Sequence, residues 1–176
     1  MRSRSTYGPM VATPARRETH RAPRVLAEGA GLGIASAAVA ALWFLVPDLL
    51  AGAPFRTPAL LGRSLFGDAI GSDGAALVVA YTVFHVAVHV LFGLAAAGLF
   101  AIAERQPSFV WAIFMLGCCL AVVYIAFAYV MWRWLAGAMA PWIVIAGTPL
   151  GGLTMLGMLL ARHRRVLEEA ATAVDE

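Results

Sequence analysis

The sequence predicts an all-α integral membrane protein built as a four-transmembrane-helix bundle, and three observations carry that prediction. Of its 176 residues, 61% are hydrophobic and 13% are charged, whereas soluble domains hold roughly 45–50% apolar and about 25% charged residues. The apolar residues form uninterrupted runs, each long enough to cross a hydrocarbon core of ~30 Å. Arginines gather beside these runs. Lipid is therefore the expected solvent for most of the chain.

The chain is expected to begin with a basic, disordered cytoplasmic tail over residues 1–24. This segment holds six arginines, one acid and three prolines, so it cannot bury a core. The first transmembrane span follows over about residues 25–50. A cleaved signal peptide would share its basic start, but the apolar run exceeds the usual ~7–15 residues, and Pro54 is a poor context for cleavage. We therefore favour a retained span.

The connection over residues 51–75 contains the pattern of a short helix, from about residue 58 to residue 66. Thr57 followed by a proline resembles an N-cap and a first helical turn, and Gly67 is a plausible stop. Leucines on one side and Arg63 on the other suit a helix that lies in the membrane interface. We expect a short interfacial helix in this first extracytoplasmic loop, where it could cover a pocket.

The remaining apolar runs complete a transmembrane domain over residues 25–162. They predict spans at about residues 75–103, 108–131 and 141–161, followed by a cytoplasmic C-terminal tail over 163–176. With the N-terminus inside, ten arginines lie on the inner side and three on the outer side. The positive-inside rule thus favours both termini in the cytoplasm, and we expect the protein to be integral to the cytoplasmic (inner) membrane.

One polar stripe marks the second span. Tyr81, His85, His89 and Gly93 recur every four residues, so they lie along one face of a helix. A polar group in lipid is costly without a partner, so this face is expected to point at the other helices. Tyr124 of the third span reaches roughly the same depth as the histidines. His85 and His89 are the candidate metal-binding and cofactor-binding residues.

Four uses of this stripe stay open. His85 and His89 could bind a transition metal, but a metal site normally needs a third or fourth ligand, and Cys118 and Cys119 lie nearer the cytoplasmic side. One of the histidines could be an axial ligand of haem, with a second copy or a partner supplying the other. The pair could also pass protons or ions. Finally, both histidines could simply hydrogen-bond neighbouring helices and hold their register.

Small residues at helical spacing predict close packing of helices, either inside the chain or with a partner. The stripes are Gly29, Gly33, Ala37 and Ala41 in the first span, Gly93 and Ala97 in the second, and Gly147 and Gly151 in the fourth. The segment 147–152 contains Pro149 between glycines, so it could also kink or unwind the fourth helix.

The sequence carries no nucleophile with a base, no phosphate loop and no acidic pair, so an enzyme acting alone is not favoured. Nucleic acid is not an expected partner either, because the basic residues flank the spans. The first hypothesis is a non-catalytic membrane subunit or assembly factor that packs against other membrane proteins or against itself. The alternatives are a haem-binding or metal-binding redox protein that uses His85 and His89, and a small channel or transporter.

Overall fold

The computed structural model describes residues 21–71, 73–103, 106, 117, 122, 125–133 and 140–163, and all regular structure among them is helical. The elements are α2 (Arg21–Leu50), α3 (Arg56–Phe66), the short 3-10 helix η1 (Gly67–Ala69), α4 (Gly74–Ala103) and α6 (Pro141–Arg162). Residues 125–133 are also helical. Three of these helices, α2, α4 and α6, are long and apolar enough to cross a membrane.

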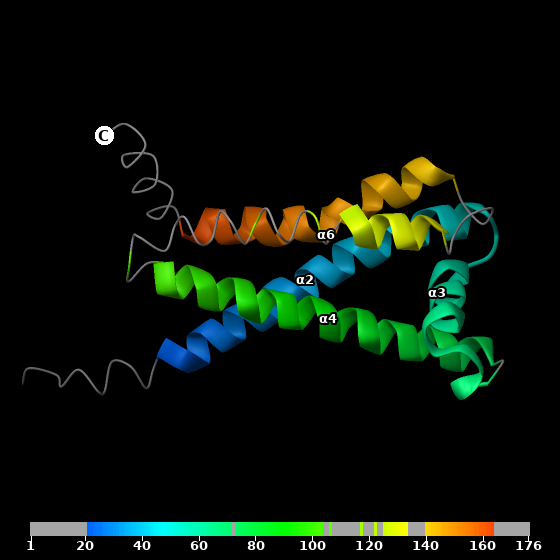
Figure 1. Ribbon diagram of the computed structural model, residues 1–176, viewed down its shortest axis with the longest axis horizontal. Coiled ribbons are helices and arrows are strands. Elements are labelled where there is room, and N and C mark those ends of the chain that lie inside the picture. Colours follow the sequence, from blue (N-terminus) through cyan, green and yellow to red (C-terminus); the bar gives the residue numbers. More distant parts are fainter. Residues whose placement is uncertain are drawn as a thin grey trace, which may run out of the picture.

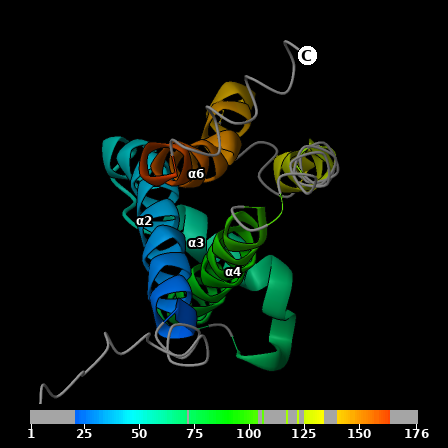
Figure 2. The same ribbon diagram turned by 90° about the vertical axis from the view of Figure 1, so that its left-hand side faces the viewer.

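Helix α2 runs between the other two long helices, α4 and α6, and packs against both. Figure 1 shows α2 crossing diagonally from the α4 side at its start to the α6 side at its end. Figure 2, turned by 90°, shows α4 and α6 on different sides of α2. The short helix α3 lies across one end of the bundle and packs mainly on α4. The predicted second span, 75–103, lies within α4, and the predicted fourth span, 141–161, lies within α6.

The first helix is longer than the predicted span. It begins at Arg21, four residues inside the expected tail, because Pro23 falls in its first turn, where a proline breaks no helical hydrogen bond. Residues 1–20 and 164–176, which hold the rest of the two predicted tails, are outside the described residues. Most of the predicted third span, 108–131, also lies outside them.

Glycines bring α2 and α4 into backbone contact. A Cβ atom added to Gly29 would lie 2.6 Å from the Cα atom of Leu94, and one added to Gly93 would lie 2.8 Å from the backbone nitrogen of Gly33. These separations are shorter than any real Cβ contact, so no larger residue fits unless the helices move apart. Gly29 and Gly33 of the first stripe therefore lie against Gly93 of the second inside the chain, whereas Ala41 of the first stripe is exposed.

Two apolar clusters fill the space between the helices. One lies toward the start of α2, and its buried members are Leu32, Ala97, Phe100, Met155 and Leu159. The other joins α3 to α6 and to the helical residues 125–133, and its buried members are Leu61, Met131 and Val144. At the end of the bundle where α2 begins, the Glu28 carboxylate accepts a hydrogen bond of 3.2 Å from His163 Nε2 and lies 3.6 Å from the Arg162 guanidinium.

The predicted N-cap of α3 is wrong, although the helix and its stop at Gly67 are as expected. The helix begins one residue before Thr57, and the capping position is Phe55, which has a left-handed backbone (φ 67°) and makes no side-chain cap. The carboxylate of Asp48 at the end of α2 replaces the cap. It accepts hydrogen bonds from the Thr57 backbone N–H (2.7 Å) and from Thr57 Oγ1 (2.9 Å). A carboxylate at a helix N-terminus is favourable because it meets free N–H groups and the positive end of the dipole.

The fourth predicted span does not unwind at its proline. Helix α6 continues through Pro149, and Figure 1 shows that it changes direction near its middle. A proline removes one backbone hydrogen bond and pushes the preceding turn away, so a bend is the expected result.

Candidate functional site

The polar stripe of α4 forms a ladder of three aromatic rings that begins at Tyr81, in the first half of the helix, and ends at His89, near its midpoint. The rings of Tyr81 and His85 stack with centroids 5.7 Å apart, and those of His85 and His89 lie 4.3 Å apart and tilted by 50°. The four-residue spacing places each ring above the next on one helix face. Both histidines are half-buried. The ladder faces the other described helices, since His85 contacts α2 and His89 lies beside Gly151 of α6.

His85 ties α4 to α2. Its Nε2 atom lies 3.2 Å from the carbonyl oxygen of Ala37. A carbonyl oxygen only accepts, so His85 carries a proton on Nε2 and donates it across the helix interface. Ala37 belongs to the small-residue stripe of α2, and its small side chain lets the imidazole reach the backbone. Interhelical hydrogen bonds of this kind contribute about 0.6 kcal/mol on average in membranes.

His89 donates through the opposite ring nitrogen to that of His85. Its Nδ1 atom donates to the carbonyl oxygen of His85, one turn earlier in α4, at 2.9 Å. The Nε2 atom then faces α6, where it lies 3.0 Å from the position that a Cβ atom of Gly151 would occupy. The two histidines, identical in the sequence pattern, therefore do different things: His85 donates to α2 and His89 packs its free edge against α6.

Ser36 completes this contact and links the remaining pair of helices. Its buried hydroxyl donates to the carbonyl oxygen of Gly151 at 2.8 Å. Ser36, His89 and Gly151 lie near the midpoints of α2, α4 and α6, so the three helices meet at one polar point. We call these three residues the central junction. A Cβ atom at position 151 would lie 3.0 Å from both His89 Nε2 and Ser36 Oγ, so these two side chains would have to give by a few tenths of an ångström to admit one.

The central junction limits what His85 and His89 can bind in this arrangement. The donating nitrogen of each ring is used within the protein, which leaves the two unprotonated nitrogens, Nδ1 of His85 and Nε2 of His89, as possible ligand atoms. A Cβ atom built on Gly151 would lie 3.0 Å from His89 Nε2, so α6 closely approaches this nitrogen, and a porphyrin could reach it only if α6 moved away. Among the described residues, no three histidine, cysteine, aspartate or glutamate side chains gather as a metal-binding group.

The other residues singled out by sequence fall in different places. Tyr81 packs against the buried cluster of Leu61, Met131 and Val144, where α3 meets α6. Tyr124, Cys118 and Cys119 lie outside the described residues.

Two interhelical polar contacts were missed by sequence reasoning. The sequence does not single out Ser36, because one serine in an alanine-rich helix resembles a small packing residue. Its spacing from Gly29 and Gly33 nevertheless places it on the same helix face as the packing stripe. Trp43 was missed for a different reason. Its indole Nε1–H donates to the Ile143 carbonyl oxygen at 2.8 Å, in the first turn of α6. Indole edges commonly seek such a carbonyl, but the pairing depends on helix arrangement.

Comparisons of this chain with protein-family models, with curated proteins and with solved structures find no match.

Proposed function

We propose that this protein is a non-catalytic integral membrane subunit or assembly factor, which packs against other membrane proteins or against further copies of itself. The observation that carries the proposal is the use of the histidine stripe. His85 donates to α2, His89 donates within α4 and packs against α6, and Ser36 joins α2 to α6. His85, His89 and Ser36 thus serve contacts between the described helices, which is a usual part for polar groups in a membrane scaffold.

The proposed placement is a four-span bundle in the cytoplasmic membrane, with 108–131 as the remaining span and both termini inside. The arginine distribution supports this orientation. Arg24 at the start of α2 and Arg162 at the end of α6 belong to the same end of the bundle, since Arg162 lies 3.6 Å from Glu28 of α2. Helix α3 lies at the opposite end (Figure 1), where its polar and apolar sides suit the interface on the extracytoplasmic side of the membrane.

The proposal is tested by purifying a tagged chain from its native membrane in a mild detergent, followed by native mass spectrometry. We expect a stoichiometric membrane-protein partner or a homo-oligomer of defined size. The control is a membrane that expresses the tag on an unrelated protein of similar length. A chain that emerges alone and monomeric, both in mild detergent and in detergent-free nanodiscs cut from the membrane, would contradict the proposal.

A second candidate, a metal-binding redox protein, is favoured by one observation. A metal-ligating histidine commonly donates its other ring N–H to a carbonyl, and both His85 and His89 donate a ring N–H to a carbonyl in this way. Under this alternative, His85 and His89 would be ligands and a partner chain would supply others. Absorption spectra and metal analysis of the complex separate the two ideas. Stoichiometric metal or a Soret band that the double variant His85→Ala, His89→Ala removes would favour the redox protein over the scaffold.

A further inference from the structure

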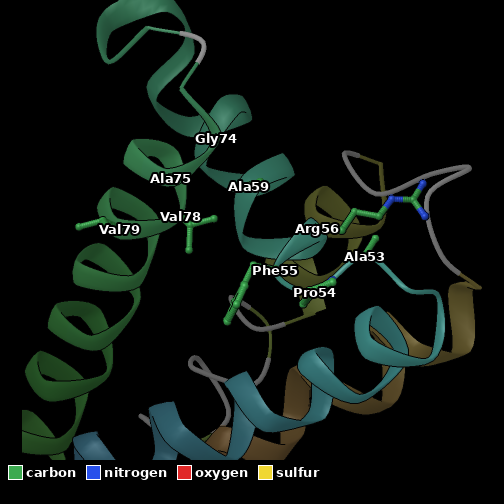
Figure 3. A pocket seen from close by; sticks show the side chains of 9 residues that line it. All are labelled: Ala53, Pro54, Phe55, Arg56, Ala59, Gly74, Ala75, Val78 and Val79. Atoms are coloured by element: carbon green, nitrogen blue, oxygen red, sulfur yellow. The ribbon is translucent and has the colours of Figure 1, made fainter.

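A hollow of about 480 Å³ lies between α3 and the first turns of α4, a volume within the range of small-molecule sites. Figure 3 shows Phe55 and Ala59 on one side, and Gly74, Ala75 and Val78 on the other. The small residues create the space, since nothing lies within 4 Å of a Cβ atom placed on Gly74. Phe55 is 53% exposed, although it is a large apolar side chain. The walls are therefore apolar and open to the surroundings.

The hollow lies at the depth where lipid headgroups meet acyl chains, given a membrane-spanning α4. Helix α4 has 30 residues, so it is about 45 Å long, against a hydrocarbon core of ~30 Å. Roughly 7 Å at each end then extends past the hydrocarbon. Val78 comes four residues after the start of α4, about 6 Å along the helix, which places it at that boundary.

A single basic residue lies at the rim of this apolar hollow. Figure 3 shows that the Arg56 side chain extends away from α4, so its base is next to the hollow and its guanidinium lies outside. Arg56 is exposed, and none of the ion pairs within the described part of the chain includes it. Arginine binds phosphate oxygens through two parallel N–H groups. An apolar hollow with an arginine at its rim therefore matches a molecule with one apolar chain and one anionic phosphate.

We propose that this hollow is a binding site for an anionic phospholipid, with one acyl chain against Phe55 and Val78 and the headgroup phosphate on the Arg56 guanidinium. This inference rests on the membrane placement given under the proposed function, but not on a protein partner. One arginine near a membrane surface contributes enough to favour an anionic over a zwitterionic headgroup about fivefold.

The test measures lipid retention by native mass spectrometry of the purified chain, with phosphatidylglycerol and phosphatidylcholine of identical acyl chains. Wild type is expected to keep one phosphatidylglycerol with about a fivefold preference over phosphatidylcholine. Arg56→Gln should remove the preference. Arg63→Gln, at an exposed arginine on the same helix but outside the hollow, is the matched control and should keep it. Ala75→Phe, which fills the hollow, should lower retention of both lipids.

Three outcomes would overturn the lipid site. They are equal retention of both lipids by wild type, equal behaviour of Arg56→Gln and Arg63→Gln, and displacement of phosphatidylglycerol by inorganic phosphate at the same concentration, which would indicate a site for free anions. Thermal unfolding of each variant in detergent identifies any that fail to fold, and the exposed Arg56 is not part of the core. If wild type shows no lipid preference but retains a protein partner, the lipid site is wrong and the proposed function stands. If wild type shows the lipid preference but emerges alone and monomeric, the proposed function is wrong and the lipid site stands.

Discussion

Replacing Gly93 by alanine is the most direct test of the α2–α4 contact. The new Cβ atom would lie 2.8 Å from the backbone nitrogen of Gly33, whereas ordinary contacts begin at 3.4 Å, and it would collide with the carbonyl oxygen of Gly29. Backbone atoms cannot turn aside as a flexible side chain can, so the helices must separate by at least about 0.6 Å. Such a separation would lengthen the His85–Ala37 hydrogen bond from 3.2 Å to about 3.8 Å, beyond hydrogen-bonding range.

The expected magnitude follows from three effects. Overpacking costs about 1–3 kcal/mol, and loss of one interhelical hydrogen bond costs about 0.6 kcal/mol more. Alanine gains about 0.5–1 kcal/mol over glycine inside a helix. Gly93→Ala should therefore lower the free energy of unfolding by about 1–3 kcal/mol. Gly98→Ala is the matched control, because it makes the same change in the same helix with nothing within 4 Å of the new Cβ atom.

The assay is reversible unfolding in mixed micelles with increasing sodium dodecyl sulfate, followed by circular dichroism. Gly98→Ala should equal or exceed wild type in stability, and Gly93→Ala should unfold at a clearly lower fraction of denaturing detergent. If the two variants unfolded together, the backbone contact between α2 and α4 described above would be refuted.

Three further predictions concern the end of the bundle that carries α3. Asp48→Ala should lower the free energy of unfolding by about 1–3 kcal/mol, because it leaves the buried Thr57 N–H and hydroxyl without their acceptor. Protease cleavage in the connection between α2 and α3 should become faster, and unchanged cleavage would contradict this account. Trp43→Phe should cost about 1 kcal/mol in the same detergent titration, since it deletes the indole donor to Ile143 and keeps most of the packing. Phe55→Gly should raise the thermal unfolding temperature or leave it unchanged, because glycine adopts the left-handed backbone with less strain; a clear fall would show that the Phe55 side chain matters more than its backbone.

The polar stripe of α4 shows which features of the site the sequence predicts and which it does not. The four-residue spacing of Tyr81, His85 and His89 places them on one face of α4, and the cost of exposing polar groups to lipid turns that face inward. The spacing could not distinguish the two histidines. Which ring nitrogen donates depends on whether a carbonyl of α2 or of α4 lies within reach, and this follows from how the helices cross.

The cap of α3 shows the opposite case, in which a local signal misled. Thr57 followed by a proline has the composition of an N-cap, yet Thr57 lies inside the helix and donates to Asp48. A residue nine positions away in the chain does the capping, because the turn at the end of α2 returns the chain beside it. Local propensity contributes about 1 kcal/mol at a cap, and a buried carboxylate with two donors outweighs it.

What the sequence determined by itself is the existence of long apolar helices, the inward polar face of α4 and the glycines that require close neighbours. These features follow from the period of the helix and from the hydrophobic effect, both of which act on residues close together in the chain. The tertiary structure alone decided which stripes meet: Gly29 and Gly33 with Gly93, and Ser36 and His89 with Gly151. Such pairings depend on helix crossing and rotation, which are set by the fit of whole surfaces and leave no signal at any single position.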